Sequence, residues 1–214
     1  MSDDPGSLSA PNSCLSAPQF SIELQPKLSV AIALTDAYIT DTYITDTYIM
    51  STFSLYLIRH GLAGQFGDYA DDALRPLTSE GVQKTRKVAR RLREVGVQVD
   101  RLFTSPYLRA HQTAKILQEE GIGTDLEVLN CLAPEGSFAA WLEVLQAWQA
   151  VAKPIAIVGH EPDLSQAAER LIFGDIVNRF VLKKAGTIGL ELPTTGNLVG
   201  KSTIFWLTSP RLLL

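Results

Sequence analysis

Cysteine, histidine and long apolar runs are all scarce in this chain of 214 residues. Its two cysteines, Cys14 and Cys131, are too few for the disulfide framework of a small secreted protein, so we expect a reducing, cytoplasmic location. No apolar run approaches the roughly 20 residues of a membrane-spanning helix. The formal net charge is −4, which provides no basic surplus for binding nucleic acid or an anionic membrane. We therefore expect a globular protein whose partners are neither nucleic acids nor membranes.

The beginning of the chain differs in composition from the rest. It is rich in Ser, Pro, Asp and Ala, which is typical of disorder. A five-residue repeat, "TDAYITDTYITDTYI", then covers Thr35 to Ile49, and its period fits neither a helix nor a strand. We interpret residues 1–49 as a disordered or spurious extension, and residues 50–214 as the functional domain. Met50 is our hypothesis for the native start, and a genuine flexible tail is the alternative.

From Phe53 onward, short apolar segments alternate with longer amphipathic ones, which predicts alternating strands and helices. The longest helix should begin after Thr78, whose hydroxyl can cap it, and should end at Gly96. The last two apolar segments are typical of a hairpin. We expect strands in residues 53–58, 100–105, 124–132, 154–160, 186–193 and 202–208, and further helices in residues 105–121, 137–151 and 162–174.

This alternation predicts an α/β fold with three layers, in which helices cover both faces of a mostly parallel central sheet. In such folds, ligands bind beyond the carboxyl ends of the strands. Three predicted strand ends carry polar residues that are costly to bury. One strand ends in Arg59–His60, a second runs into "TSPYLR" with Arg109, and a third ends in Gly159–His160. The remaining histidine, His111, lies within a predicted helix, where we expect it at the surface.

The segments around these residues resemble a known family. "LIRHG", "TSPYLRAHQTA" and "IVGHEP" are similar, in this order, to the three signature segments of the histidine phosphatase superfamily, which includes the phosphoglycerate mutases. The resemblance covers residues 51–214 and implies the phosphoglycerate mutase-like version of the three-layer fold. The compact length, the "RPLT" segment and the ending "WLTSPRLLL" are most similar to SixA-type phosphohistidine phosphatases.

The resemblance implies a role for each of the four strand-end residues. His60 matches the nucleophile of the family, which forms a covalent phosphohistidine and must be neutral to attack. We expect the neighbouring arginines to disfavour its protonated form. Arg59 and Arg109 would grip the phosphoryl oxygens with their planar guanidinium groups. His160 would donate hydrogen bonds to the same oxygens in the transition state.

The sequence also departs from the family pattern. Leu62 follows the RHG segment where many members have an acidic residue, and the glutamate that commonly serves as general acid is missing near Asn130–Cys131. The SixA-like alignment places Asp72 and Arg75 at the border of the phosphate. Asp72 is therefore one candidate for the acid, with an ordinary loop aspartate as the alternative. Glu135 and Glu161 are further candidates.

We therefore predict a phosphatase that removes a phosphoryl group from a phosphohistidine on a phosphorelay protein. The absence of long insertions that could close over a small metabolite favours a protein substrate. The alternatives are a small-molecule phosphomonoesterase of the same superfamily and a non-catalytic phosphate-binding module. The resemblance implies no cofactor, and we expect no metal, because no histidine besides the presumed nucleophile is available to join His160 as a ligand.

Overall fold

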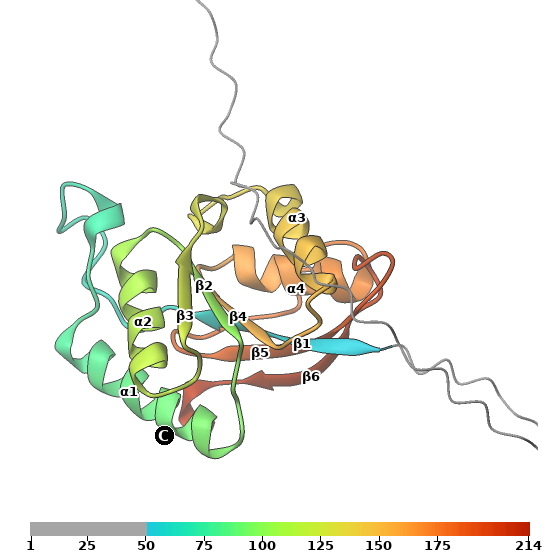
Figure 1. Cartoon of the computed structure of the whole chain (residues 1–214). Coiled ribbons are helices and arrows are strands. Elements are labelled where there is room, and N and C mark those ends of the chain that lie inside the picture. Colours follow the sequence, from blue (N-terminus) through green and yellow to red (C-terminus); the bar gives the residue numbers. More distant parts are fainter. Residues whose placement is uncertain (1–50) are drawn as a thin grey trace, which may run out of the picture. The chain divides into compact units, whose positions relative to one another are not determined.

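A mixed six-stranded sheet forms the centre of the computed structural model, which describes residues 51–214. The predictions for residues 1–49 lie outside the described residues. The strand order is β3-β2-β4-β1-β5-β6, with parallel pairing from β3 to β1 and antiparallel pairing of β5 and β6 at one edge (Figure 1). The strands are β1 (Thr52–Arg59), β2 (Arg101–Thr104), β3 (Asp125–Val128), β4 (Ile155–Gly159), β5 (Thr187–Pro193) and β6 (Thr203–Thr208).

Helices cover both faces of this sheet, so the predicted three-layer fold is confirmed. One face carries α1 (Ser79–Glu94) and α2 (Leu108–Glu119), and the other carries α3 (Phe138–Gln149) and α4 (Asp163–Phe173) (Figure 1). The side chains of the strands alternate between these two layers. Leu102 of β2 belongs to the apolar cluster beneath α1 and α2, whereas the ring of Phe103 meets that of Trp148 from α3. All residues of the central strand β4 are buried, as its apolar sequence predicted.

The boundaries of α1 agree with the prediction, but those of α2 and β3 differ. The Thr78 hydroxyl accepts a hydrogen bond from the Gly81 amide at 2.9 Å and caps α1. α2 begins at Leu108, three residues later than expected, because the Ser105 hydroxyl accepts a hydrogen bond from the Tyr107 amide and holds an extended turn. β3 ends at Val128, four residues earlier than expected, because its partner β2 ends opposite that residue.

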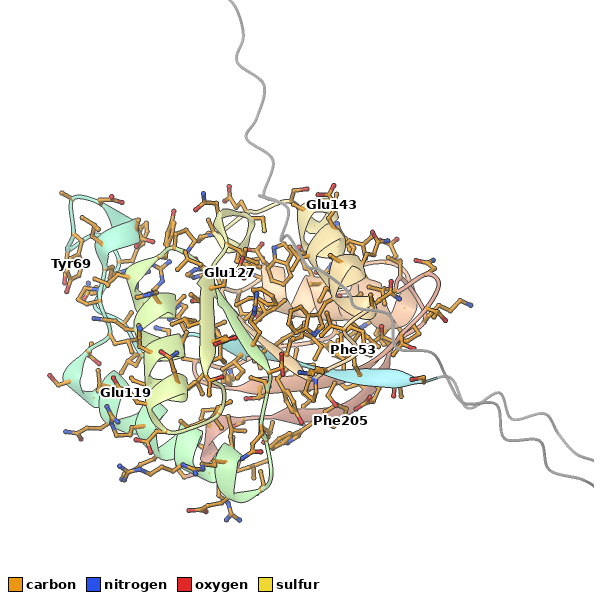
Figure 2. The ribbon with its side chains drawn as sticks, in the orientation of Figure 1. Phe53, Tyr69, Glu119, Glu127, Glu143 and Phe205 are labelled. Atoms are coloured by element: carbon orange, nitrogen blue, oxygen red, sulfur yellow. The ribbon has the colours of Figure 1, made fainter. Side chains whose placement is uncertain are left out.

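The predicted closing hairpin is confirmed, since β5 and β6 pair antiparallel. β6 lies at the edge of the sheet and leaves the side chain of Phe205 47% exposed (Figure 2). Among residues 51–214, no helix combines the length and apolarity needed to span a lipid bilayer.

Candidate active site

The two histidines at strand ends lie side by side because β1 and β4 are parallel neighbours. Arg59 is paired with Gly159, so His60 and His160 leave the sheet at the same edge. Their ring centroids are 5.2 Å apart. β2 joins the same edge from the other side of β4, and there the Ser105 hydroxyl lies 2.8 Å from Nε2 of His160. The sheet register therefore brings three separate segments of the sequence into one site.

His60 is held as a neutral imidazole with a defined tautomer. Its Nδ1 lies 2.7 Å from the carbonyl oxygen of Gly61, and since a carbonyl only accepts, Nδ1 carries the hydrogen. Nε2 therefore keeps its lone pair, which accepts a hydrogen bond of 3.3 Å from Nε of Arg109. The residue is 5% exposed, and this burial lowers the pKa of His60 to about 3. His160 and the two arginines add to the effect, but burial is its main cause.

His160 is likewise buried and neutral. Burial, followed by the charge of Arg109, lowers the pKa of His160 to about 3. Its Nε2 meets Ser105, but its Nδ1 is buried without a hydrogen-bond partner. Buried polar atoms without a partner are uncommon in folded proteins.

The glycine that follows His60 is required by close packing. A Cβ atom on Gly61 would overlap the Thr85 hydroxyl oxygen of α1. The amide of Gly61 also donates a 3.0 Å hydrogen bond to the Thr113 hydroxyl of α2. These contacts hold the carbonyl of Gly61 that selects the His60 tautomer, which explains why a glycine follows His60.

Asp72 links two arginines at the rim of the site. Its Oδ1 accepts a hydrogen bond from Nε of Arg75 at 2.7 Å, and its Oδ2 lies 3.0 Å from Nη2 of Arg109. Nη1 of Arg109 donates to the backbone carbonyl of Asp72 at 2.8 Å. The hydrogen bond from Arg75 is the main cause that holds the pKa of the Asp72 carboxyl below its usual range. Asp72 is therefore an ionised group that orients two guanidinium groups.

A well-anchored loop between α4 and β5 positions Arg59. The buried carboxylate of Glu169 accepts hydrogen bonds from the four consecutive amides of residues 177–180. The same loop then supplies the Leu182 carbonyl, which accepts a 2.8 Å hydrogen bond from Nη1 of Arg59. Nε of Arg59 is buried and has no partner. The loop continues to Lys184, whose pKa is lowered by burial and by the three arginines of the site.

These side chains line a cavity of about 330 Å³ that contains all six residues predicted for the site. It holds two more cations than carboxyl groups, although the chain as a whole is acidic. The lining residues are Arg59, His60, Phe66, Asp72, Arg75, Tyr107, Arg109, Pro134, His160, Glu161 and Lys184. His111 is half-buried on α2 and does not line the cavity.

The prediction missed Phe66, Tyr107 and Lys184. Lys184 could have been found, because a final strand that pairs antiparallel with β1 must begin beside the carboxyl end of β1. The amide of Ala185 does donate hydrogen bonds to the carbonyls of Arg59 and His60, at 3.1 and 3.2 Å. Phe66 and Tyr107 lie on loops, for which the sequence carried no such signal.

Three buried polar atoms without a partner belong to residues of this cavity: Nε of Arg59, Nδ1 of His160 and Oε1 of Glu161. They make up half of all such side-chain atoms in the described part of the chain. Two of them are nitrogen atoms that can donate to an anion, and the excess of cations favours one as well. The cavity is therefore suited to a phosphoryl group. Within residues 51–214, no three His, Cys, Asp or Glu side chains form a group that could hold a metal ion.

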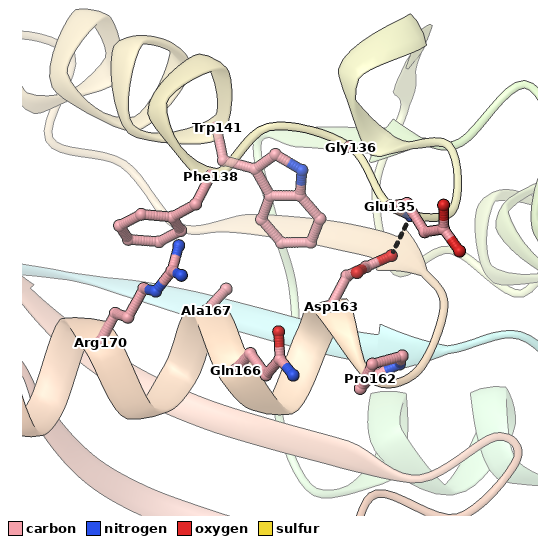
Figure 3. Close-up of a pocket in the computed structure, with 9 residues that line it drawn as sticks. All are labelled: Glu135, Gly136, Phe138, Trp141, Pro162, Asp163, Gln166, Ala167 and Arg170. Atoms are coloured by element: carbon pink, nitrogen blue, oxygen red, sulfur yellow. Dashed lines mark hydrogen bonds between the residues drawn. The ribbon is translucent and has the colours of Figure 1, made fainter. Parts of the chain in front are cut away.

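A second, larger hollow of about 410 Å³ lies between α3 and α4 (Figure 3). It shares a wall with the cavity, because Pro134 and Glu161 line the cavity while the next residues, Glu135 and Pro162, line the hollow. Within the hollow, the Glu135 amide donates a 3.0 Å hydrogen bond to Oδ2 of Asp163 (Figure 3). No histidine lines the hollow, which is formed by Glu135, Gly136, Phe138, Trp141, Pro162, Asp163, Gln166, Ala167 and Arg170.

Two known proteins are similar to this chain in sequence. An uncharacterised protein of Picosynechococcus sp. is 43% identical over 162 residues, which are 75% of this chain and 98% of that protein. The phosphohistidine phosphatase SixA of Escherichia coli is 30% identical over 162 residues, which are 73% of this chain and 93% of that protein.

Solved structures show the same architecture. A protein histidine phosphatase SixA complexed with tungstate matches with a TM-score of 0.66 and 28% identity, over 75% of this chain and 99% of that one. A phosphoserine phosphatase of Entamoeba histolytica shares the fold with a TM-score of 0.57 and 17% identity, over 76% of this chain and the whole of that one. Residues 55–160 match the histidine phosphatase superfamily (branch 1). With its strand-end histidines and arginines in one cavity, the chain belongs to the histidine phosphatase superfamily and is similar to SixA.

Proposed function

We propose that the protein is a phosphatase that acts through a covalent phosphohistidine on His60, and that its substrate is a phosphohistidine on a phosphorelay protein. The observation that carries this proposal is the state of His60. It is neutral, its Nε2 lone pair points toward a guanidinium group, and it lines a cavity with a surplus of cations. The similarity to SixA supports the choice of phosphohistidine.

The phosphoryl group would be bound mainly by arginines. Nε of Arg59 has no partner and is free to donate to a phosphoryl oxygen. Arg109 would exchange its hydrogen bond to His60 for one to the substrate, which releases the Nε2 lone pair for attack. Asp72 and Arg75 would border the substrate, with Asp72 holding both Arg75 and Arg109 in position. Positioning and charge stabilisation of this kind supply most of the catalysis in phosphoryl transfer.

His160 would stabilise the transition state. If the Ser105 hydroxyl donates to Nε2 of His160, the single hydrogen of the neutral ring lies on Nδ1. That N–H has no partner and would donate to a phosphoryl oxygen as negative charge accumulates there. Water would then hydrolyse the phosphohistidine and release inorganic phosphate.

The surroundings of the cavity support a protein substrate. Phe66 at its rim is 77% exposed, and the neighbouring hollow extends the accessible surface beyond the shared wall. A phosphorylated side chain that enters the cavity would leave the rest of its protein next to Phe66 and the hollow. A small metabolite would occupy the cavity and would not reach the neighbouring hollow.

A rapid-quench experiment with radiolabelled substrate tests the proposed intermediate. We expect an acid-labile phosphoenzyme in the wild type, with the label on the peptide that contains His60. His60→Ala should form none and should lose turnover, because no covalent route remains. Label on His160 or His111, or full turnover in His60→Ala, would contradict the proposal.

The substrate class is tested by comparing kcat/KM for a phosphorylated histidine-containing phosphotransfer protein, p-nitrophenyl phosphate and phosphoglycerate. The proposal predicts the highest value for the protein. A higher value for phosphoglycerate would favour the small-molecule phosphomonoesterase instead. Binding of phosphate without turnover of any of the three would favour a phosphate-binding module.

A further inference from the structure

The transfer of a phosphoryl group to His60 leaves one requirement open, namely a proton for the leaving group. Three carboxyl groups near the site are candidates. Asp72 is a poor donor because its carboxylate is ionised and hydrogen-bonded through both oxygens to Arg75 and Arg109. Glu135 is exposed and lines the neighbouring hollow, not the cavity. This leaves Glu161.

Glu161 has the placement that a proton donor needs. It follows His160 directly and lines the cavity that holds both histidines. Its Oε2 accepts a 2.5 Å hydrogen bond from the Ser165 hydroxyl one turn further along the chain, which fixes the side chain. Its Oε1 is buried and has no hydrogen-bond partner among the described residues. One oxygen is thus anchored, and the other has no competing hydrogen-bond partner.

The surroundings of Glu161 favour its protonated form. Burial is the main influence and raises the pKa of Glu161, and the nearby carboxylate of Asp163 acts in the same direction. The Ser165 hydroxyl and the charge of Arg59 oppose the rise but do not cancel it. A bound phosphoryl group would place further negative charge beside the carboxyl group, which favours protonation again. An ionised Glu161 would repel that same substrate.

We propose that Glu161 is the general acid of the reaction, a role that rests on the function proposed above. The lone pair of His60 Nε2 forms the bond to phosphorus while the bond to the leaving atom breaks. The electron pair of that bond stays on the leaving atom, which receives the proton of Glu161. In the second step a water oxygen bonds to phosphorus, Glu161 takes up the proton of that water, and the P–N electron pair returns to Nε2. Glu161 is then ready for the next cycle.

Two aryl phosphates separate this role from a structural one. The p-nitrophenolate of p-nitrophenyl phosphate leaves readily without a proton, whereas the more basic phenolate of phenyl phosphate needs one. Glu161→Gln should lower kcat/KM for phenyl phosphate about 10²-fold and that for p-nitrophenyl phosphate less than about threefold. Glu135→Gln, the same change in the neighbouring hollow, should alter neither. Equal losses on both substrates, or no loss on phenyl phosphate, would overturn the proposal.

A second variant keeps the carboxyl group and tests its titration. The Ser165 hydrogen bond lowers the pKa of Glu161, so Ser165→Ala should shift the alkaline limb of kcat/KM for phenyl phosphate to higher pH. Glu161→Gln should lack that limb. A limb that stays in place in Ser165→Ala would overturn the proposal even if Glu161→Gln fails to fold. The rapid-quench experiment distinguishes a failure of this proposal from a failure of the proposed function. If wild-type His60 becomes phosphorylated, the proposed function holds even where the role of Glu161 is contradicted.

Discussion

Two adjoining hollows of this protein contain similar components but differ in chemistry. In the cavity lined by His60 and His160, the Arg109 guanidinium lies 4.9 Å from the centre of the Tyr107 ring, and in the neighbouring hollow Arg170 lies 4.9 Å from that of Phe138. Both hollows also contain an aspartate. Only the cavity lies where the carboxyl ends of β1, β2 and β4 converge, and only there does the arginine contact a histidine.

The difference is clearest in the ionisable groups. The Asp72 carboxylate contacts two arginines, and their hydrogen bonds and charges lower its pKa. Asp163 contacts the Glu135 amide, and burial raises its pKa. Arg170 takes part in none of the ion pairs between residues 51 and 214. The larger hollow is therefore not the better candidate for catalysis, because convergence of polar groups matters more than volume.

The largest effect that separates the two hollows is expected at His160. His160→Ala should lower kcat about 10²–10³-fold, because it removes one preorganised donor to the transition state. Slow phosphorylation of His60 should survive and be visible by rapid quench. Gln166→Ala in the neighbouring hollow is the control and should keep wild-type turnover. A comparable loss in the control would show that the two hollows act as one site.

Arg109 and Arg170 each lie over an aromatic ring, so their alanine variants can be compared directly. Arg109→Ala should weaken competitive inhibition by phosphate or vanadate about 10-fold or more, since charge-assisted hydrogen bonds contribute roughly 1.5–3 kcal/mol each. Arg170→Ala should leave this inhibition unchanged. Measured inhibition constants check both expectations, and a similar weakening in the two variants would argue against phosphate binding in the cavity alone.

A smaller effect should reveal whether the neighbouring hollow contacts the substrate protein. We expect Arg170→Glu to change kcat/KM for the phosphorylated protein by a few-fold, because it reverses the charge of a surface beside the bound side chain. Turnover of p-nitrophenyl phosphate should stay constant. Lys87→Glu on the exposed surface of α1 makes the same change of charge elsewhere and should alter neither rate. If the two variants behave alike, the hollow plays no special part.

The smallest effect concerns stability and has opposite signs in the two hollows. Because the pKa of Asp72 is lowered in the folded state, its ionisation stabilises the fold above the ordinary pKa of aspartate, and this stabilisation is lost as the pH falls through its lowered pKa. The pKa of Asp163 is raised, so its ionisation destabilises the fold at neutral pH.

At pH 7, Asp72→Asn should therefore lower Tm by roughly 2 °C, and Asp163→Asn should leave it equal or slightly higher. Both differences from the wild type should shrink toward acidic pH. Thermal unfolding of both variants and the wild type between pH 3 and pH 7 measures these differences in Tm. Shifts of the same sign in both variants would show that charge does not distinguish the two aspartates.

Much of the fold could be predicted because its signals are local. The apolar segments that became β1 and β4, and the capping Thr78 of α1, are visible within a few neighbouring residues. The start of α2 and the end of β3 could not be predicted in the same way. The first depends on the Ser105 turn, and the second depends on where the partner strand β2 ends.

Local sequence patterns predict which side chains reach the edge of the sheet, because a polar residue that directly follows a buried apolar strand lies at the end of that strand. Arg59, His60 and His160 follow from this rule. Their chemical states depend on the folded structure. The low pKa of His60, the raised pKa of Glu161 and the second arginine beside Asp72 result from burial and from contacts between distant residues, such as the one from Arg109 to His60 across 49 positions. Sheet register and helix packing set those contacts, and no local pattern encodes them.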